Sequence, residues 1–129
     1  MHVAILSART GWHTDELCRA LAEHGHAGVV LPYEKLVGRL PGGLTSESVP
    51  ILEADAVLAR IIPGGSLEQV IYRVDALHWI EERGVLVVNS PRTIERCVDK
   101  FYTTALLHDA GLPTPETVVW NQSSSGLVA

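Results

Sequence analysis

Short apolar segments alternate with helical patterns along most of this sequence. Each apolar segment is brief and rich in residues that favour β-structure, as in HVAILS near the N-terminus, and such runs are typical of buried strands. We expect four of these strands, at residues 2–7, 28–31, 56–60 and 85–89. Because strands that alternate with helices form mostly parallel sheets, the sequence predicts an α/β fold, a small mostly parallel sheet with helices on both faces.

Helices are expected between these strands. One begins at residue 13 or 14 and ends near residue 24, and a second is capped by Ser66 and ends near residue 83. Residues 38–50 are rich in Gly, Pro and Ser, so we expect a loop there, with or without a short hairpin. A short helical turn is expected from residue 90 to residue 96.

The second helix carries apolar residues at i, i+3 and i+4 spacing, which predicts a buried face. Arg73 and Asp75 lie in the same helix, and we expect them to form intrahelical or surface pairs. The predicted buried face comprises Leu67, Val70, Ile71, Val74, Leu77 and His78.

The composition excludes several classes of protein. The 129 residues carry a formal net charge of -5, whereas general nucleic-acid binding requires a basic face. No apolar run reaches the roughly 18–20 residues of a membrane span, and the N-terminus has no signal-peptide pattern. We therefore expect a cytoplasmic protein that has no nucleic-acid partner and does not interact with a membrane.

The cysteines and histidines form no pattern typical of a metal site, so no metal ligand is predicted. Cys18 and Cys97 are far apart and belong to no CxxC pair, which favours free thiols in a reducing compartment over a disulfide or a nucleophile. The six histidines lack zinc spacing. His24 and His26 flank Gly25 at an expected helix end, where a C-cap is favoured over a metal pair.

Three polar residues lie at the carboxyl ends of the third and fourth expected strands. Ligands of parallel α/β sheets bind beyond the carboxyl ends of the strands, and Arg60, Asn89 and Ser90 lie there. Arg60 is either a surface residue or an anion clamp, because its planar fork can hold a carboxylate or a phosphate. Asn89 and Ser90 either form the turn and cap a helix or contact a ligand. The loop SARTGW lacks the glycines of GxGxxG, which disfavours a dinucleotide site.

The segment CVDKFYTTALLHDAGLPTPET predicts a helix that is followed by a Pro-x-Pro sequence, which cannot continue it. Asp99 is the expected N-cap, and Phe101, Ala105 and Leu106 are expected to form a buried face. The helix dipole disfavours a cation at Lys100, unless a phosphate is bound beside it. On spacing alone a surface lysine is the favoured interpretation of Lys100, with a phosphate contact as the alternative.

The segment RTIERCVDKFYTTALLHDAGLPTPET resembles the hinge of ATP-grasp ligases, which carry an Asp-Lys pair followed by Ala-Gly-Leu-Pro-x-Pro-x-Thr. The preceding segment ARIIPGGSLEQVIYRVDALHWIEERGVLVVNSP is similar to the RimK-type branch, the α-L-glutamate ligases. Within that branch, SLEQVIYRVDALH most resembles enzymes that add glutamate to a pterin such as tetrahydromethanopterin. The resemblance runs from about residue 1 to residue 119 and is strongest over residues 56–119.

The resemblance implies a chemistry and several roles. In this family ATP, with Mg²⁺, phosphorylates a substrate carboxylate to an acylphosphate, and an amine then attacks to form an amide or peptide bond. The lysine of the Asp-Lys pair approaches the ATP phosphates, a role that would fall to Lys100. The first domain helps to bind the acceptor, a small molecule or peptide, which would give substrate-binding roles to Arg60, Asn89 and Ser90.

The resemblance also implies a division of the chain. Residues 1–97 would be the Rossmann-like domain that precedes the ATP-grasp core, residues 98–119 would be a linking helix and the entry to that core, and residues 120–129 a mobile tail. The core would supply the Mg²⁺ ligands, so no catalytic residue is predicted here and this chain alone is expected to be inactive.

Two kinds of partner and two alternative functions remain open from the sequence. Phe101, Leu106 and Leu112 would form an apolar patch without the core, so we expect either a complementary ATP-grasp chain or a homodimer. The main alternative function is a non-catalytic α/β module that binds a ligand or a partner at the strand edge. A nucleotide-binding Rossmann domain is disfavoured by the glycine count.

Overall fold

The computed structural model describes residues 1–120 of the chain. The chain divides into two compact units, residues 1–94 and residues 95–129, and the second is described as far as Trp120. Apart from Trp120, the predicted mobile tail at 120–129 therefore lies outside the described residues.

The first unit is built around a four-stranded parallel sheet with the strand order β2-β1-β6-β7. In the register, Val3 pairs with Gly28 on one side and with Ala56 on the other, and Val57 pairs with Val87. The predicted fold class, a small parallel α/β sheet, is confirmed. The strands are β1 (His2–Ser7), β2 (Ala27–Pro32), β6 (Ala56–Ala59) and β7 (Leu86–Val88).

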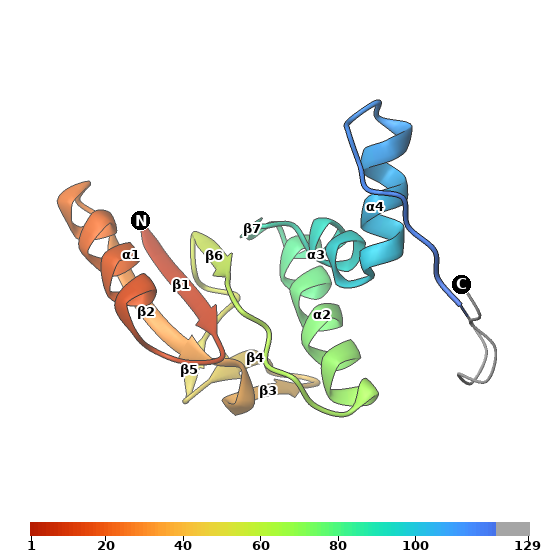
Figure 1. The fold of residues 1–129 in the computed structure, drawn as a ribbon. Helices are drawn as coiled ribbons and strands as arrows, with labels where there is room; N and C mark the ends of the chain where they lie inside the picture. The colour runs from red at the N-terminus through yellow and green to blue at the C-terminus, as the bar shows by residue number, and fades with distance from the viewer. Residues whose placement is uncertain (121–129) are drawn as a thin grey trace. The chain divides into compact units, whose positions relative to one another are not determined.

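Two helices flank this sheet. Helix α1 (Trp12–Glu23) connects β1 to β2, and α2 (Leu67–Glu82) connects β6 to β7. The two connections leave the central β1–β6 pair in opposite directions, so right-handed crossovers place the helices on opposite faces; Figure 1 shows α1 and α2 on the two sides of the sheet. Gly28 allows close packing of α1 on β2, because a Cβ there would lie 2.8 Å from Leu21 Cδ1.

A second, antiparallel sheet occupies the segment in which the sequence predicts a loop with or without a hairpin. The hairpin is present, and a third strand extends it in the order β3-β4-β5. Glu47 and Ser48 both have positive φ, as a two-residue hairpin turn of this kind requires. The buried Ser46 hydroxyl donates a 2.8 Å hydrogen bond to the Pro32 carbonyl and ties this sheet to the end of β2. The elements are a 3-10 turn η1 (Tyr33–Lys35), β3 (Leu36–Arg39), β4 (Gly43–Ser46) and β5 (Val49–Pro50).

The buried face of α2 differs from the predicted one. Leu67 and Ile71, both predicted to be buried, are 72% and 49% exposed. With 3.6 residues per turn, the observed face is rotated by roughly a quarter of a turn from the predicted one. Val74 and Leu77 are buried as predicted, but the prediction was wrong for Leu67 and Ile71, because it followed the apolar residues of the first turns, whereas the sheet contacts the middle of the helix. The buried residues of α2 are Arg73, Val74, Ala76, Leu77 and Ile80.

Arg73 is a buried side chain, so its predicted pairing within the helix or at the surface is wrong. Its Nη1 donates hydrogen bonds to the carbonyl oxygens of Pro63 and Gly64, at 2.7 and 3.2 Å. The ion pairs described within residues 1–120 do not involve Arg73. Since a buried charge needs hydrogen-bond partners, these carbonyls stabilise the guanidinium, which in turn holds the loop between β6 and α2 against the helix.

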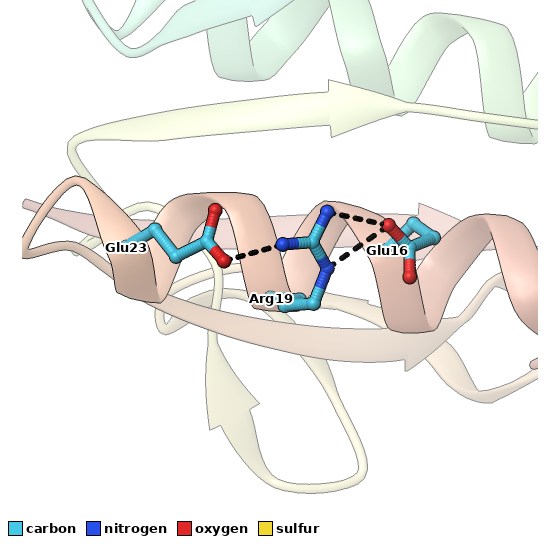
Figure 2. Close-up of polar contacts among 3 residues, drawn as sticks. All are labelled: Glu16, Arg19 and Glu23. Carbon is cyan, nitrogen blue, oxygen red and sulfur yellow. Dashed lines mark hydrogen bonds and ion pairs between the residues drawn. The ribbon is translucent and has the colours of Figure 1, made fainter.

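The exposed face of α1 carries a short ion-pair network centred on Arg19 (Figure 2). Arg19 Nη2 lies 2.7 Å from Glu16 Oε2, and its Nη1 pairs with Glu23 one turn further along the helix. The hydrogen bond from Arg19 holds the pKa of Glu16 below its usual value. These exposed pairs contribute little to stability. Arg19 already forms ion pairs with two carboxylates, so it is a poor candidate for binding an anionic ligand.

The second unit contains α4 (Lys100–Asp109), preceded by α3 (Pro91–Val98), which crosses the boundary between the units. Asp99 is the N-cap of α4, as predicted, and its Oδ1 accepts a 2.8 Å hydrogen bond from the Tyr102 amide. Gly111 ends the helix at positive φ, which only glycine adopts readily.

The predicted buried face of α4 is wrong for the described part of the chain. Phe101 is 49% exposed, and Ala105 and Leu106 are half-buried. The segment after α4 partly covers one side of the helix, since a hollow of about 470 Å³ is lined by α4 residues and by residues 114–117. That segment is too small to bury the helix within residues 95–120.

We predict that Leu77→Ala lowers the free energy of unfolding by about 2–5 kcal/mol, because Leu77 is fully buried in the core between α2 and the sheet. Urea unfolding, followed by circular dichroism, measures the loss. Leu67→Ala on the same helix is the matched control and should change stability by less than about 0.5 kcal/mol. Equal losses for the two variants would contradict the observed face of α2.

Arg73→Met should lower the free energy of unfolding by about 1–3 kcal/mol, because it leaves the Pro63 and Gly64 carbonyls without their donor. It should also speed amide hydrogen exchange at Gly64 and Gly65. Arg73→Lys keeps one donor group and should lower the free energy of unfolding by less than Arg73→Met does. The exposed Arg92→Met is the control, and the assignment fails if it equals Arg73→Met in both measurements.

Candidate site at the carboxyl edge of the sheet

The loops after β1 and β6 are held together at the carboxyl edge of the parallel sheet. The Arg60 amide donates to the Leu6 carbonyl at 2.9 Å, and the Ala8 amide donates to the Ile61 carbonyl at 2.9 Å. The two strands therefore remain aligned for one or two residues beyond their assigned ends. This alignment places Arg60 beside the loop that leads into α1.

A hollow of about 70 Å³ lies where these two loops meet the start of α1. The buried Ser7 hydroxyl donates to the Arg9 carbonyl at 2.9 Å and shapes the first loop. At the helix start, the Gly11 amide donates to Thr14 Oγ1, which itself donates to the Gly11 carbonyl. The residues lining the hollow are Ser7, Arg9, Thr10, Gly11, Trp12, His13, Thr14, Arg60 and Ile61.

The charges around this hollow are positive. Arg9 and Arg60 both line it, and both residues are exposed. No ion pair is described for either guanidinium within residues 1–120. The N-terminus of α1 adds the positive end of its helix dipole. Two arginine residues beside a helix N-terminus suit a small anion, such as a carboxylate or a phosphate.

Asn89 and Ser90 lie on the neighbouring part of the same edge. Val88, the last residue of β7, pairs with Leu58 of β6. Asn89 and Ser90 follow Val88 at this edge, as Ala59 and Arg60 follow Leu58. The Val88–Asn89 peptide bond is cis. Asn89 is exposed there.

The Ser90 side chain caps the start of α3. Its hydroxyl lies 2.9 Å from Thr93 Oγ1 and accepts a 3.3 Å hydrogen bond from the Thr93 amide. This is the capping alternative that the sequence left open.

Lys100 belongs to the second unit, as the first residue of α4. Its side chain is exposed, and no hydrogen bond or ion pair of its ammonium group is described within residues 95–120. The Asp99 carboxylate already satisfies the Tyr102 amide of the first turn. A phosphate at this position would therefore rely on the lysine more than on the helix amides.

Sequence reasoning missed two arginines of the first unit. Arg9 lies in the loop SARTGW, which was judged by its glycine count alone, although its arginine was visible in the sequence. Arg73 was assigned to the helix surface, and only the observed packing of α2 reveals its bonds to Pro63 and Gly64. Arg9 lines the hollow itself, whereas Arg73 fixes the loop that follows Arg60.

Residues 1–120 contain neither a long apolar helix nor a cluster of metal-ligand side chains. None of the helices in this range is both long and apolar enough to cross a membrane. The same residues contain no group of three or more His, Cys, Asp or Glu side chains arranged to hold a metal ion. Cys18 is half-buried, Cys97 is exposed, and both are free thiols.

Comparison with curated proteins finds relatives among amide-forming ligases. The tetrahydromethanopterin:α-L-glutamate ligase of Methanosarcina acetivorans is 39% identical over 77 residues, which are 60% of this chain and 24% of that protein. The enzyme of the same name from Methanococcus maripaludis is 26% identical, and the match covers all of this chain and 44% of that protein. The chain thus spans less than half the length of these relatives. No family model matches it.

Solved structures give the same fold. A RimK domain ATP-grasp protein from Sphaerobacter thermophilus matches with a TM-score of 0.66 and 24% identity, over 90% of this chain and 39% of that one. The ATP-grasp ligase PsnB, in complex with a minimal precursor, Mg and ADP, matches with a TM-score of 0.65 and 22% identity, over 88% of this chain and 45% of that one. In sequence and in fold, the chain is therefore similar to part of the RimK-type ATP-grasp ligases, among them the tetrahydromethanopterin:α-L-glutamate ligases.

Proposed function

We propose that this chain is the N-terminal part of an ATP-dependent carboxylate–amine ligase. The observation that carries the proposal is the 39% identity to a glutamate ligase over 77 residues, together with the shared fold. In the proposed division, residues 1–97 form the domain before the ATP-grasp core, and residues 98–119 link the two. The proposed reaction adds glutamate to a small molecule, a cofactor or a protein, in the cytoplasm.

The first unit would bind the acceptor through its carboxylate. Arg60 and Arg9 line a hollow at the carboxyl edge of the sheet, beside the N-terminus of α1. This arrangement of positive charge supports carboxylate binding, because a guanidinium can hold both oxygens of a carboxylate. Asn89 would contact the same substrate from the end of β7. Ser90 would contribute through the turn that it caps, with its hydroxyl as a weaker candidate for direct contact.

ATP, with Mg²⁺, would supply the phosphoryl group that converts the substrate carboxylate into an acylphosphate. The amine of the second substrate then attacks the acyl carbon, phosphate leaves, and an amide bond forms. In this chain Lys100 would approach the ATP phosphates, and its exposed ammonium group fits that role. The Mg²⁺ ligands would come from the ATP-grasp core, so this chain alone should be inactive. A complementary core is the proposed partner.

Calorimetric titration with ATP and Mg²⁺ tests the role of Lys100. We expect weak binding that Lys100→Ala reduces by about tenfold or more, since hydrogen bonds to charged groups contribute about 1.5–3 kcal/mol. The chain has one other lysine, the exposed Lys35, and Lys35→Ala is the matched control that should bind as the unmodified chain does. Binding that is equal in all three proteins, or absent from all three, would overturn the phosphate contact and favour a non-catalytic binding module.

A further inference from the structure

The positively charged hollow at the carboxyl edge of the sheet is small. Its volume is about 70 Å³, whereas pockets that enclose a whole drug-sized ligand measure about 300–1,000 Å³. The hollow can therefore enclose only a small group, such as a carboxylate. The rest of an acceptor whose carboxylate is bound by Arg9 and Arg60 must lie outside the hollow, against the exposed side chains around it.

Two of the side chains that line this hollow are both apolar and exposed. Trp12, the first residue of α1, is 70% exposed, and Ile61, which follows Arg60, is 49% exposed. We call Trp12 and Ile61 the apolar rim of the hollow. Sites for small molecules combine apolar and aromatic side chains with a few charged or polar groups. The apolar rim and the two arginines provide this combination in the first unit.

The Trp12 indole contacts a neighbouring ring and is still mostly exposed. Its centroid lies 5.0 Å from that of the His13 imidazole, and the two ring planes meet at 73°, an edge-to-face arrangement that aromatic pairs favour. This contact restricts the orientations of the indole. A tryptophan also has only two side-chain torsions, so little conformational entropy is lost when a ligand covers it. Trp12 thus offers a large, partly ordered, flat surface beside the hollow.

A flat aromatic ring is the group that fits this surface best. Two aromatic rings attract each other beyond the apolar area that they bury, whereas an aliphatic chain gains only from burial. The ring must also lie close to the carboxylate of the acceptor, because Trp12 and Arg60 line the same small hollow. These two conditions together describe an aromatic acid.

We propose that the acceptor of this chain is an aromatic acid, in which a flat ring lies next to the carboxylate. Arg9 and Arg60 bind the carboxylate in the hollow, and the ring stacks on Trp12, with Ile61 beside it. Trp12 is then a specificity-determining residue that favours aromatic over aliphatic acceptors. This inference rests on the proposed function, because it requires the carboxylate site at the same edge of the sheet.

Titration of the ¹⁵N-labelled chain with benzoate, cyclohexanecarboxylate and acetate tests this inference. Benzoate should bind about two- to tenfold more tightly than acetate, the gain expected of an aromatic pair, and should shift the indole N–H resonance of Trp12. Cyclohexanecarboxylate has a ring of similar size that is not flat, so it should bind more weakly than benzoate. Trp12→Ala should remove most of the preference for benzoate. Trp120→Ala, which removes an exposed tryptophan of the second unit, is the control and should keep that preference.

The possible failures of this test are distinguishable. Equal dissociation constants for benzoate and acetate, or a preference that survives in Trp12→Ala, would overturn the aromatic acceptor and leave the carboxylate site in place. Cyclohexanecarboxylate that binds as tightly as benzoate would overturn it as well, because any apolar group would then suffice. If none of the three acids binds, or if all bind equally well to Arg60→Gln, the carboxylate site itself is overturned, and the inference with it.

Discussion

The alignment of β1 with β6 is the constraint on which the rest of the first unit depends. Their register pairs Val3 with Ala56, and the hydrogen bonds from Arg60 to Leu6 and from Ala8 to Ile61 extend it beyond the strands. Because side chains alternate along a strand, a slip of one residue would reverse the orientation of every side chain in this pair. The register thus buries the core and brings the loop that begins α1 beside Arg60.

The connection from β6 to α2 is held by a buried cation. Arg73 lies inside the unit and satisfies backbone carbonyls of the loop, with no carboxylate pair described for it in residues 1–120. The nearby Tyr33 hydroxyl is buried, and burial raises the pKa of Tyr33 although the charge of Arg73 acts in the opposite direction. A long polar side chain thus fixes the loop after Arg60, where an apolar residue would leave carbonyls unpaired.

The parallel sheet could be predicted from the sequence, because short apolar runs mark buried strands and strands that alternate with helices form parallel sheets. It could not predict which face of α2 is buried, since Leu67 and Ile71 suit a helix core equally well and only the position of the sheet excludes them. The extra strand β5 has two residues, too few for a periodic signal. At the candidate site, Arg60 could be predicted because it lies at the end of an apolar strand. Arg9 lies beside it only because of the register between β1 and β6, which the sequence does not reveal.

We propose that the carboxyl edge of this sheet binds a substrate carboxylate. A direct test titrates the ¹⁵N-labelled chain with acetate, as a probe for the acceptor's carboxylate, and follows the backbone amide resonances, with the Arg60→Gln protein beside it and the exposed Arg92→Gln as control. We expect shifts that are confined to residues 7–14 and 60–61 and that are lost only in Arg60→Gln. Shifts that persist in Arg60→Gln, that fall elsewhere, or that do not occur would contradict it.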